Sequence, residues 1–274
     1  MNRTTEIQLA EELLALHRGK SAFLADAVTT APVEAYTDTR RFRRERAKIM
    51  RTALHPAVHA GELPERGSFL RRDVAGLPVL FTRDGDGAAH AFLNVCRHRG
   101  TRLVDEERGC KRRFSCPYHA WTYSNRGELL GLPHAKQGFP DADRDSLGLK
   151  RLGCVEKYGW LWVTAATDES PDVEGRLAGL AGSLDWLGAD NYRIVHSDEI
   201  LCSANWKLLV EGGIEAYHFR VAHRKTIGPY FLDNLSTDRC FGPHMRSVLA
   251  KRSLPQLAEQ PVESWRLLDH AQVL

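Results

Sequence analysis

The stretch "NVCRHRGTRLVDEERGCKRRFSCPYHAW", residues 94–121, contains two short pairs of residues that commonly bind metals. The first pair is Cys96 and His98, and the second is Cys116 and His119, with seventeen residues between His98 and Cys116. Two thiolates and two imidazoles at close spacing suggest a metal site, and zinc is the first candidate. Zinc fingers, however, usually pair Cys with Cys and His with His, whereas each pair here holds one of each.

Mixed pairs suit a cluster of two irons, in which one iron takes both thiolates and the other takes both imidazoles. That is the Rieske [2Fe–2S] arrangement, where two histidines raise the reduction potential relative to an all-cysteine cluster. Gly100 and Pro117 fit tight turns around such a cluster, where backbone N–H groups can donate to the sulfurs. A zinc-stabilised binding module is the alternative for the same four residues.

The sequence on both sides of this stretch predicts a small antiparallel β domain. Residues 68–95, "SFLRRDVAGLPVLFTRDGDGAAHAFLNV", hold short apolar runs, and Asp-Gly between such runs is a strong hairpin signal. Short strand-like runs with glycine turns continue to "VEKYGWLWVTA", residues 155–165. We therefore expect a β domain at 60–166, between a helical N-terminal segment at 1–59 and a third region at 167–274.

Apolar spacing outside the β domain predicts further elements. Helices are expected at 5–17 and at 38–53, because apolar residues recur there at roughly helical intervals. A strand-like alternation occupies 192–204, and "NWKLLVEGGIEAYHFRVAH", residues 205–223, predicts another helix, which Gly212 and Gly213 weaken.

Composition argues against several classes of protein. The formal net charge of +3 is too small to indicate a nucleic-acid partner, and the basic run "RRFRRERAK", residues 40–48, is expected to be a solvated helix face. No apolar run reaches the roughly 18 residues that span a bilayer, and the acidic N-terminal residues do not fit a signal peptide. We expect a cytoplasmic protein without a membrane partner, whose six cysteines are ligands and buried thiols.

The segment 205–223 carries a second group of candidate ligands. Glu211, Glu215 and His218 have the spacing i, i+4 and i+7, so a continuous helix would place them on one face. His218 and His223 are five residues apart, which on a regular helix is about 140° out of register. Both can bind one ion only if the helix ends or bulges between them. Two histidines and a carboxylate fit the facial triad of a non-haem Fe(II) site with open positions.

Both groups carry a family resemblance. "CRHRG" (96–100) and "CPYHAWTY" (116–123) resemble the Rieske domain of ring-hydroxylating oxygenase alpha subunits, and 205–223 resembles the catalytic domain of the same family. The resemblance implies an α+β fold: an antiparallel β Rieske domain plus an incomplete helix-grip (START-like) catalytic domain. It also implies that the [2Fe–2S] cluster is bound by Cys96, His98, Cys116 and His119.

In the second domain, the resemblance implies that His218 and His223 are ligands of a mononuclear Fe(II). Glu215 would be the acidic residue that links this iron to a Rieske histidine of the neighbouring subunit. This contact implies a head-to-tail homotrimer, in which electrons cross between subunits.

The function implied is that of a terminal oxygenase component, an O₂-dependent hydroxylase or demethylase that acts as a mono- or dioxygenase. Its electrons would pass from the cluster to the mononuclear iron. A separate NADH-dependent reductase or ferredoxin would supply them, because the chain shows no Gly-rich dinucleotide fingerprint. The substrate is a small organic molecule, and an aromatic ring, as in aromatic hydrocarbon catabolism, and an N-methyl amine both fit the motif.

The chain departs from the family in one respect. Family members supply a third iron ligand, usually Asp, far downstream. The acidic residues after His223 are Asp233, Asp238, Glu259, Glu263 and Asp269. None has the expected separation, and the final "HAQVL" resembles the start of a strand, so we expect a fragment of a longer oxygenase. The alternative is a Rieske electron-transfer protein whose second domain is not catalytic.

Overall fold

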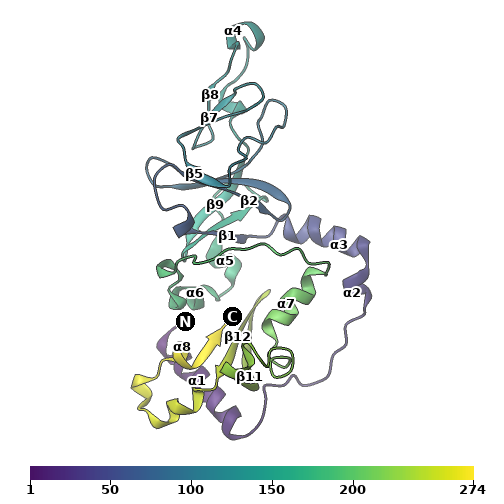
Figure 1. Cartoon of the computed structure of the whole chain (residues 1–274), viewed down its shortest axis with the longest axis vertical. Coiled ribbons are helices and arrows are strands. Elements are labelled where there is room, and N and C mark those ends of the chain that lie inside the picture. The colour runs from purple at the N-terminus through teal and green to yellow at the C-terminus, as the bar shows by residue number, and fades with distance from the viewer. The chain divides into compact units, whose positions relative to one another are not determined.

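The computed structural model describes all residues, 1–274, and shows an α+β protein with antiparallel sheets, as predicted (Figure 1). The chain forms two compact units. One, here named the β unit, holds residues 40–173 and 188–198, and the other, the helix–sheet unit, holds 1–39, 174–187 and 199–274. The predicted domain boundaries at 59 and 166 stay predictions. Among the helices, none combines the length and apolarity required to span a lipid bilayer.

The β unit is built on a seven-stranded antiparallel sheet with the order β1-β10-β9-β4-β3-β2-β5. Its strands are β1 (His55–His59), β2 (Ser68–Val74), β3 (Leu77–Arg83), β4 (Ala89–Leu93), β5 (Arg108–Cys110), β9 (Arg151–Lys157) and β10 (Trp160–Thr164). A separate three-stranded sheet contains β6 (Arg113–Ser115), β7 (Thr122–Ser124) and β8 (Leu129–Gly131). The short helix α4 (Ala135–Gly138) follows β8.

Both faces of the large sheet bury apolar side chains, because neighbouring residues of a strand point to opposite faces. Phe69 of β2 and Leu80 of β3 pack into one core, together with Cys96 and Cys116. Leu70, the neighbour of Phe69, packs into a second core. The loops that carry the two cysteines therefore rest on a buried face of the sheet.

The hairpin predicted from Asp-Gly is confirmed, since β3 and β4 pair antiparallel. Asp84 lies at the start of its turn, buried, and accepts hydrogen bonds at 2.9 Å from the backbone N–H groups of Asp86 and Ala88 and from Nε2 of His90. Arg126 forms an ion pair with the same carboxylate at 2.9 Å. Burial raises the pKa of Asp84, but the hydrogen bonds from His90 and the backbone outweigh it and hold that pKa at about 2.

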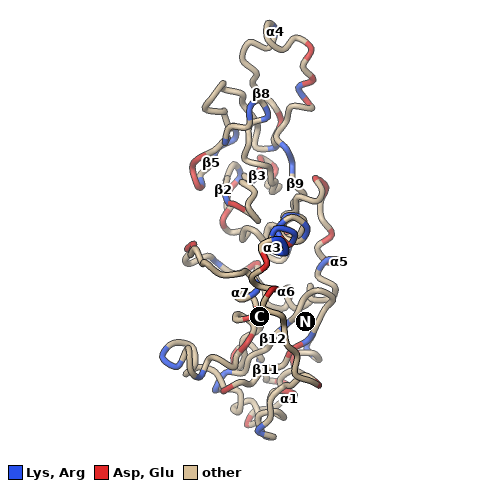
Figure 2. The backbone as a smooth tube through the Cα atoms, turned by 90° about the vertical axis from the view of Figure 1, so that its right-hand side faces the viewer, with Lys and Arg blue, Asp and Glu red and all other residues tan.

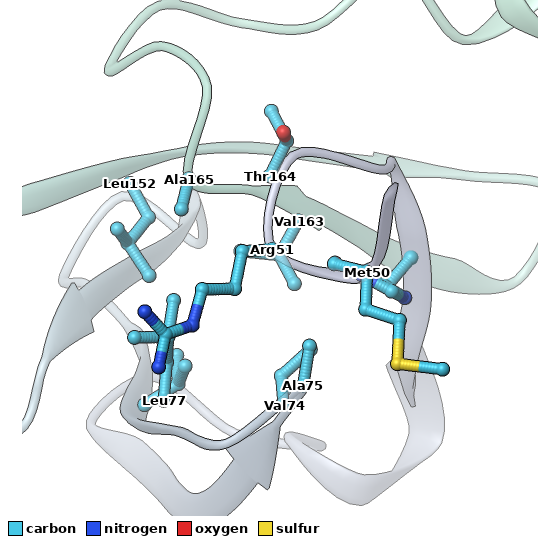
Figure 3. A pocket seen from close by; sticks show the side chains of 11 residues that line it. Met50, Arg51, Val74, Ala75, Leu77, Leu152, Val163, Thr164 and Ala165 are labelled. Carbon is cyan, nitrogen blue, oxygen red and sulfur yellow. The ribbon is translucent and has the colours of Figure 1, made fainter. Parts of the chain in front are cut away.

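The helix predicted at 38–53 is confirmed over most of its length. After α2 (Glu34–Thr37), helix α3 (Thr39–Glu45) runs directly into a π-helical segment (Arg46–Met50). Figure 2 shows the concentration of lysine and arginine along α3. Beside the π-helix, Met50, Arg51 and Val74 line a cavity of about 10 Å³ (Figure 3). A volume of that size holds at most one water molecule, so this cavity is not a substrate site.

The helix–sheet unit packs an amphipathic helix against a small sheet. Helix α1 (Arg3–Arg18), which begins after an Asn2 cap and confirms the helix expected at 5–17, buries Leu9 and Leu13 against β11 (Phe231–Phe241) and β12 (His244–Lys251). The third strand is β13 (Ala271–Val273). The remaining helices are α5 (Val173–Leu177), α6 (Ala181–Leu187), α7 (Trp206–Ile214) and α8 (Leu267–His270).

The strand predicted at 192–204 is wrong, because this stretch forms neither strand nor helix. Val195 is 96% exposed and Leu201 is 93% exposed. An alternation of apolar residues becomes a strand only where a second strand takes up its backbone hydrogen bonds. No strand of the described chain pairs with this segment.

Candidate metal centres

The two Cys-His motifs occupy loops with the same backbone hydrogen bonds. In the loop after β4, the Cys96 N–H donates to Thr101 O at 2.8 Å and the Gly100 N–H donates to Cys96 O at 3.0 Å. In the loop between β6 and β7, the Cys116 N–H donates to Trp121 O at 2.8 Å and the Ala120 N–H donates to Cys116 O at 2.9 Å. The two loops therefore share one pattern of backbone hydrogen bonds.

A left-handed residue closes each loop. Gly100 has a φ of 74° and Ala120 a φ of 57°, each four residues after its cysteine. Glycine adopts this conformation freely, which explains Gly100, whereas alanine does so at a cost. The turn expected around Gly100 is confirmed, and Ala120 is the equivalent residue that the sequence did not single out.

The loops separate the sulfurs from the imidazoles. Cys96 and Cys116 are 3% and 4% exposed and lie in the same core. His98 and His119 lie toward the surface, with their Nδ1 atoms 3.1 Å apart. Two imidazole nitrogens bound to one tetrahedral metal at about 2.0–2.1 Å would lie roughly 3.4 Å apart, so the two rings are close to the spacing that a shared metal requires.

Aromatic packing and charge act on the histidine pair. Trp121 stacks on the His98 ring, with 4.9 Å between centroids and 6° between planes, which fixes the direction of that ring. The pKa of His98 lies below its usual value, because burial disfavours the charged ring and so do His119 and Arg99. A neutral imidazole is the form that binds a metal.

Tyr123 completes the buried side of these loops, and the sequence motifs alone do not single it out. Its ring is fully buried, its hydroxyl oxygen accepts from the Arg97 N–H at 3.1 Å, and it lies 3.4 Å from Cys96 Sγ. Burial and the neighbouring Cys96 raise its pKa, so the hydroxyl keeps its proton. Because its oxygen already accepts from Arg97, that proton is available to a sulfur. Its position in β7, seven residues after Cys116, was the signal available.

The second group of candidate ligands follows α7 rather than lying on it. This helix ends at Ile214, and Glu215 is extended, with φ −99° and ψ 128°. The predicted continuous helix face for Glu211, Glu215 and His218 is therefore wrong, because the helix stops just after its two glycines, which stabilise a helix poorly. Glu211 instead accepts from the Tyr36 hydroxyl at 3.1 Å.

The end of the helix allows the two histidines to face each other. A turn in which Ala222 N–H donates to His218 O at 2.8 Å brings the His218 and His223 rings to a centroid distance of 5.1 Å. Gly228 lies close to the backbone of this turn. A side chain there would not fit, because a Cβ would lie 2.7 Å from Phe219 O and 2.8 Å from His223 O.

Neighbouring side chains hold the Nδ1 atom of each ring. His218 Nδ1 donates to Glu215 Oε2 at 2.9 Å, and the other Glu215 oxygen accepts from the His218 backbone N–H at 3.0 Å. His223 Nδ1 lies 3.2 Å from Thr226 Oγ1, and the Thr226 hydroxyl donates to the His223 carbonyl oxygen. This arrangement leaves Nε2 of both rings available for a metal, as is usual for ligating histidines.

No set of three or more His, Cys, Asp or Glu side chains in residues 1–274 comes together as a group that could hold one metal ion. Each iron of a Rieske cluster takes only two side chains, so pairs are the pattern that this cofactor requires. The donor set of the β unit fits the cluster: two buried sulfurs and two facing Nδ1 atoms. In the helix–sheet unit, the pair is present without a third protein ligand. Asp233, one of the acidic candidates, is paired with Arg220 at 3.1 Å.

Two family models match the chain. The Rieske [2Fe-2S] domain covers residues 53–158, and the catalytic domain of the ring-hydroxylating alpha subunit covers residues 189–271. A Rieske domain implies a [2Fe–2S] cluster, and the oxygenase family uses a mononuclear iron in addition.

Curated relatives match over most of this chain. The glycine betaine monooxygenase oxygenase subunit of Chromohalobacter salexigens is 33% identical over 81% of this chain and 49% of its own length. The equivalent subunit of Pseudomonas aeruginosa is 32% identical over 81% of this chain and 52% of its own length. The anthranilate 1,2-dioxygenase large subunit of Acinetobacter baylyi is 28% identical over 72% of this chain and 43% of its own length. The chain thus spans about half the length of the curated relatives it matches.

Solved structures agree with this result. The quaternary ammonium Rieske monooxygenase CntA has a TM-score of 0.75 and 26% identity, over 83% of this chain and 63% of that one. Naphthalene 1,2-dioxygenase from Rhodococcus shares the fold, with a TM-score of 0.72 over 89% of this chain and 57% of that one, at 24% identity. The sequence motifs, the fold and these matches show that the chain belongs to the family of Rieske ring-hydroxylating oxygenase alpha subunits.

Proposed function

We propose that this chain forms the terminal oxygenase component of a Rieske-type hydroxylase or demethylase. The observation that carries the proposal is the presence of two prepared histidine pairs in one chain. His98 and His119 face each other above two buried cysteines, and His218 and His223 face each other with both Nδ1 atoms held. When bound, a [2Fe–2S] cluster supplies one-electron transfer and a mononuclear Fe(II) supplies O₂ activation.

In the β unit, each residue has a defined task. Cys96 and Cys116 would hold the inner iron, where the surrounding apolar core excludes water, and His98 and His119 would hold the outer iron. Tyr123 would donate a hydrogen bond to the Cys96 sulfur, because its oxygen already accepts from the Arg97 N–H. Withdrawal of negative charge from a sulfur favours the reduced cluster and raises its potential.

In the helix–sheet unit, Glu215 would orient the histidine pair. Its carboxylate can only accept a hydrogen bond, so His218 carries its proton on Nδ1 and turns Nε2 toward the metal. Thr226 does the same for His223. Ligand orientation of this kind is commonly worth 10- to 100-fold in metal affinity.

The two centres would meet across subunits. We propose a head-to-tail homotrimer in which Glu215 of one subunit hydrogen-bonds to His98 or His119 of the next. In support, the Glu215 side chain is 46% exposed, and its carboxylate has lone pairs beyond the two that His218 uses. The Nε2 atoms of His98 and His119, which remain free when the Nδ1 atoms bind iron, would provide the donor.

The partners proposed are a separate NADH-dependent reductase or ferredoxin, O₂ and a small organic substrate. Among substrates, we propose a quaternary N-methyl amine, whose hydroxylation leads to loss of the methyl group. The support is that the relatives with 33% and 32% identity are named glycine betaine monooxygenases, and that the solved relative CntA is named a quaternary ammonium monooxygenase.

A Rieske electron carrier with a non-catalytic second domain is the second candidate. The observation that favours it is the lack of a third side chain in a group with His218 and His223 in the described chain. Glu211 and Asp233, two carboxylates of this unit, are each held by another residue.

Iron analysis and turnover separate the two candidates. The purified chain should contain about three irons if it is an oxygenase and about two if it is a carrier. His218→Ala should remove one iron while the visible spectrum of the Rieske cluster stays unchanged. With a reductase and glycine betaine, the oxygenase should form formaldehyde. A chain that keeps two irons and forms no product with the full set of components would contradict the proposal.

A further inference from the structure

The turn that carries the histidine pair also borders a cavity that none of the motifs accounts for. This cavity has a volume of about 220 Å³, and its lining includes Phe219 and Phe231. Phe219 lies beside both histidines, with centroid distances of 5.0 Å to His218 and 5.9 Å to His223. Phe219 therefore belongs both to the lining of the cavity and to the surroundings of the histidine pair.

The polar lining of the cavity is strongly positive. It contains three arginines, Arg220, Arg224 and Arg252, against a single carboxylate, Asp233. Arg220 is paired with that carboxylate at 3.1 Å. The guanidinium groups of Arg224 and Arg252 form no hydrogen bond or ion pair with another residue of the described chain.

Apolar side chains make up another part of the lining. Phe219 and Phe231 pack edge to face at 5.4 Å, and Leu232 extends the apolar surface. Because planar guanidinium groups bind carboxylates in a bidentate manner, a cavity with apolar walls and two unpaired arginines fits a small organic anion. A volume of 220 Å³ lies below the usual 300–1,000 Å³ of ligand pockets, so the anion must be small.

We propose that this cavity is an anion subsite, in which Arg224 and Arg252 bind the carboxylate of a small organic substrate and Phe219 and Phe231 contact its apolar part. The inference rests on the proposed function, because it places the anionic end of the substrate beside the His218–His223 pair. It restricts the substrate class to small carboxylates, including zwitterionic ones, and excludes neutral molecules of the same shape.

Direct binding tests the subsite without turnover. Benzoate and benzamide have nearly the same shape but differ in charge, and titration calorimetry on the full chain measures both. We expect benzoate to bind at least ten-fold more tightly than benzamide, and more tightly than acetate or inorganic phosphate because of the apolar wall. Equal affinity for benzoate and benzamide, or for benzoate and phosphate, would overturn the proposal.

Substitutions locate the site. Arg224→Gln and Arg252→Gln should each weaken benzoate binding about ten-fold, and Arg→Lys at the same positions should weaken it less, since lysine keeps the charge but loses the bidentate geometry. Asp233→Asn should strengthen binding, because it removes the opposing charge and frees Arg220. Arg18→Gln, at the exposed end of α1, is the matched control with the same loss of charge.

The benzoate-binding test gives its answer whatever the iron content of the chain. The far-ultraviolet spectrum and the cluster spectrum verify that each variant is folded. Benzoate binding that is unchanged in both arginine-to-glutamine variants overturns the subsite, even if the chain contains three irons. A chain with two irons, in which benzoate still depends on Arg224 and Arg252, supports the subsite while the oxygenase assignment fails.

Discussion

The two histidine pairs of this chain are supported in different ways. His98 and His119 sit on loops whose cysteines are part of the buried core of the β unit, and Trp121 stacks on one of the rings. His218 and His223 lie on a turn that rests on a small apolar cluster, to which Phe219 contributes, and their rings are held by hydrogen bonds with Glu215 and Thr226. The first pair is fixed by the fold, whereas the second is fixed by local contacts. Changes to the chain should therefore affect the two pairs separately.

The largest expected effect is loss of the cluster from Cys116→Ser. This thiolate is 4% exposed, so the protein core offers no replacement ligand, and the two cluster irons and the visible spectrum should disappear together. Cys110→Ser is the matched control, because Cys110 is exposed at the end of β5 and should be dispensable. If Cys116→Ser kept the full visible spectrum of the cluster, the first histidine pair would not depend on the buried cysteine.

The second-largest effect is expected at the His218–His223 pair. Glu215→Gln replaces a charged acceptor of the His218 Nδ1 proton with a neutral one, and we expect Fe(II) affinity to fall 10- to 100-fold. Competition with a chelator measures this affinity. Glu211→Gln is the control, since its carboxylate accepts from Tyr36 instead. Both variants should keep the two cluster irons, and loss of these irons from either variant would contradict the separation of the two pairs.

A smaller effect is expected in the hairpin that leads to the first loop. The pKa of Asp84 is about 2, below its unfolded value, so the ionised group stabilises the β unit above about pH 4 and this contribution disappears as the pH falls toward 2. Asp84→Asn should lower the free energy of unfolding by about 2 kcal/mol at pH 7. Urea titrations from pH 7 to pH 2.5 should show the difference between variant and parent become smaller. A difference that stays constant over this range would exclude ionised Asp84 as its source.

The smallest effect concerns the electronic environment of the first pair. Tyr123→Phe removes the hydroxyl that lies 3.4 Å from Cys96 Sγ and leaves the ring in place. A hydrogen bond worth about 1 kcal/mol corresponds to roughly 40 mV for a one-electron couple, so the reduction potential should fall by about that amount. Potentiometric titration measures it, and Tyr118→Phe, at an exposed tyrosine, is the control. An unchanged potential in Tyr123→Phe would mean that the hydroxyl does not donate to the sulfur.

Local sequence signals predicted the parts of the fold that depend on neighbours in the chain. The Asp-Gly turn predicted the β3–β4 hairpin, and apolar spacing predicted α1. Motif chemistry also selected both histidine pairs, which the structure brings to within contact distance. In each case, the residues that decide the structure lie within about twenty-five positions of one another.

Features that depend on distant contacts, and one helix boundary, were missed or wrong. The alternation at 192–204 looked like a strand, but strand formation requires a partner that the pattern cannot reveal. The helix through Glu215 was overextended, because helical spacing continued past the glycine pair that weakens α7. Tyr123 was missed because its importance arises from its contact with Cys96, which lies twenty-seven residues earlier in the sequence. The packing of α1 on β11 and β12 likewise joins the two ends of the chain.

Because both cysteines are buried, a cluster bound here would be accessible from one side only. Apolar side chains would insulate the sulfur side of such a cluster, and tunnelling falls steeply with distance, so electrons would enter and leave on the imidazole side. In the proposed oxygenase, the electron donor and the acceptor iron would then reach the cluster through the same surface, beside His98 and His119. They would have to bind that surface in turn, or the donor would have to dock at the edge of a contact that is already formed.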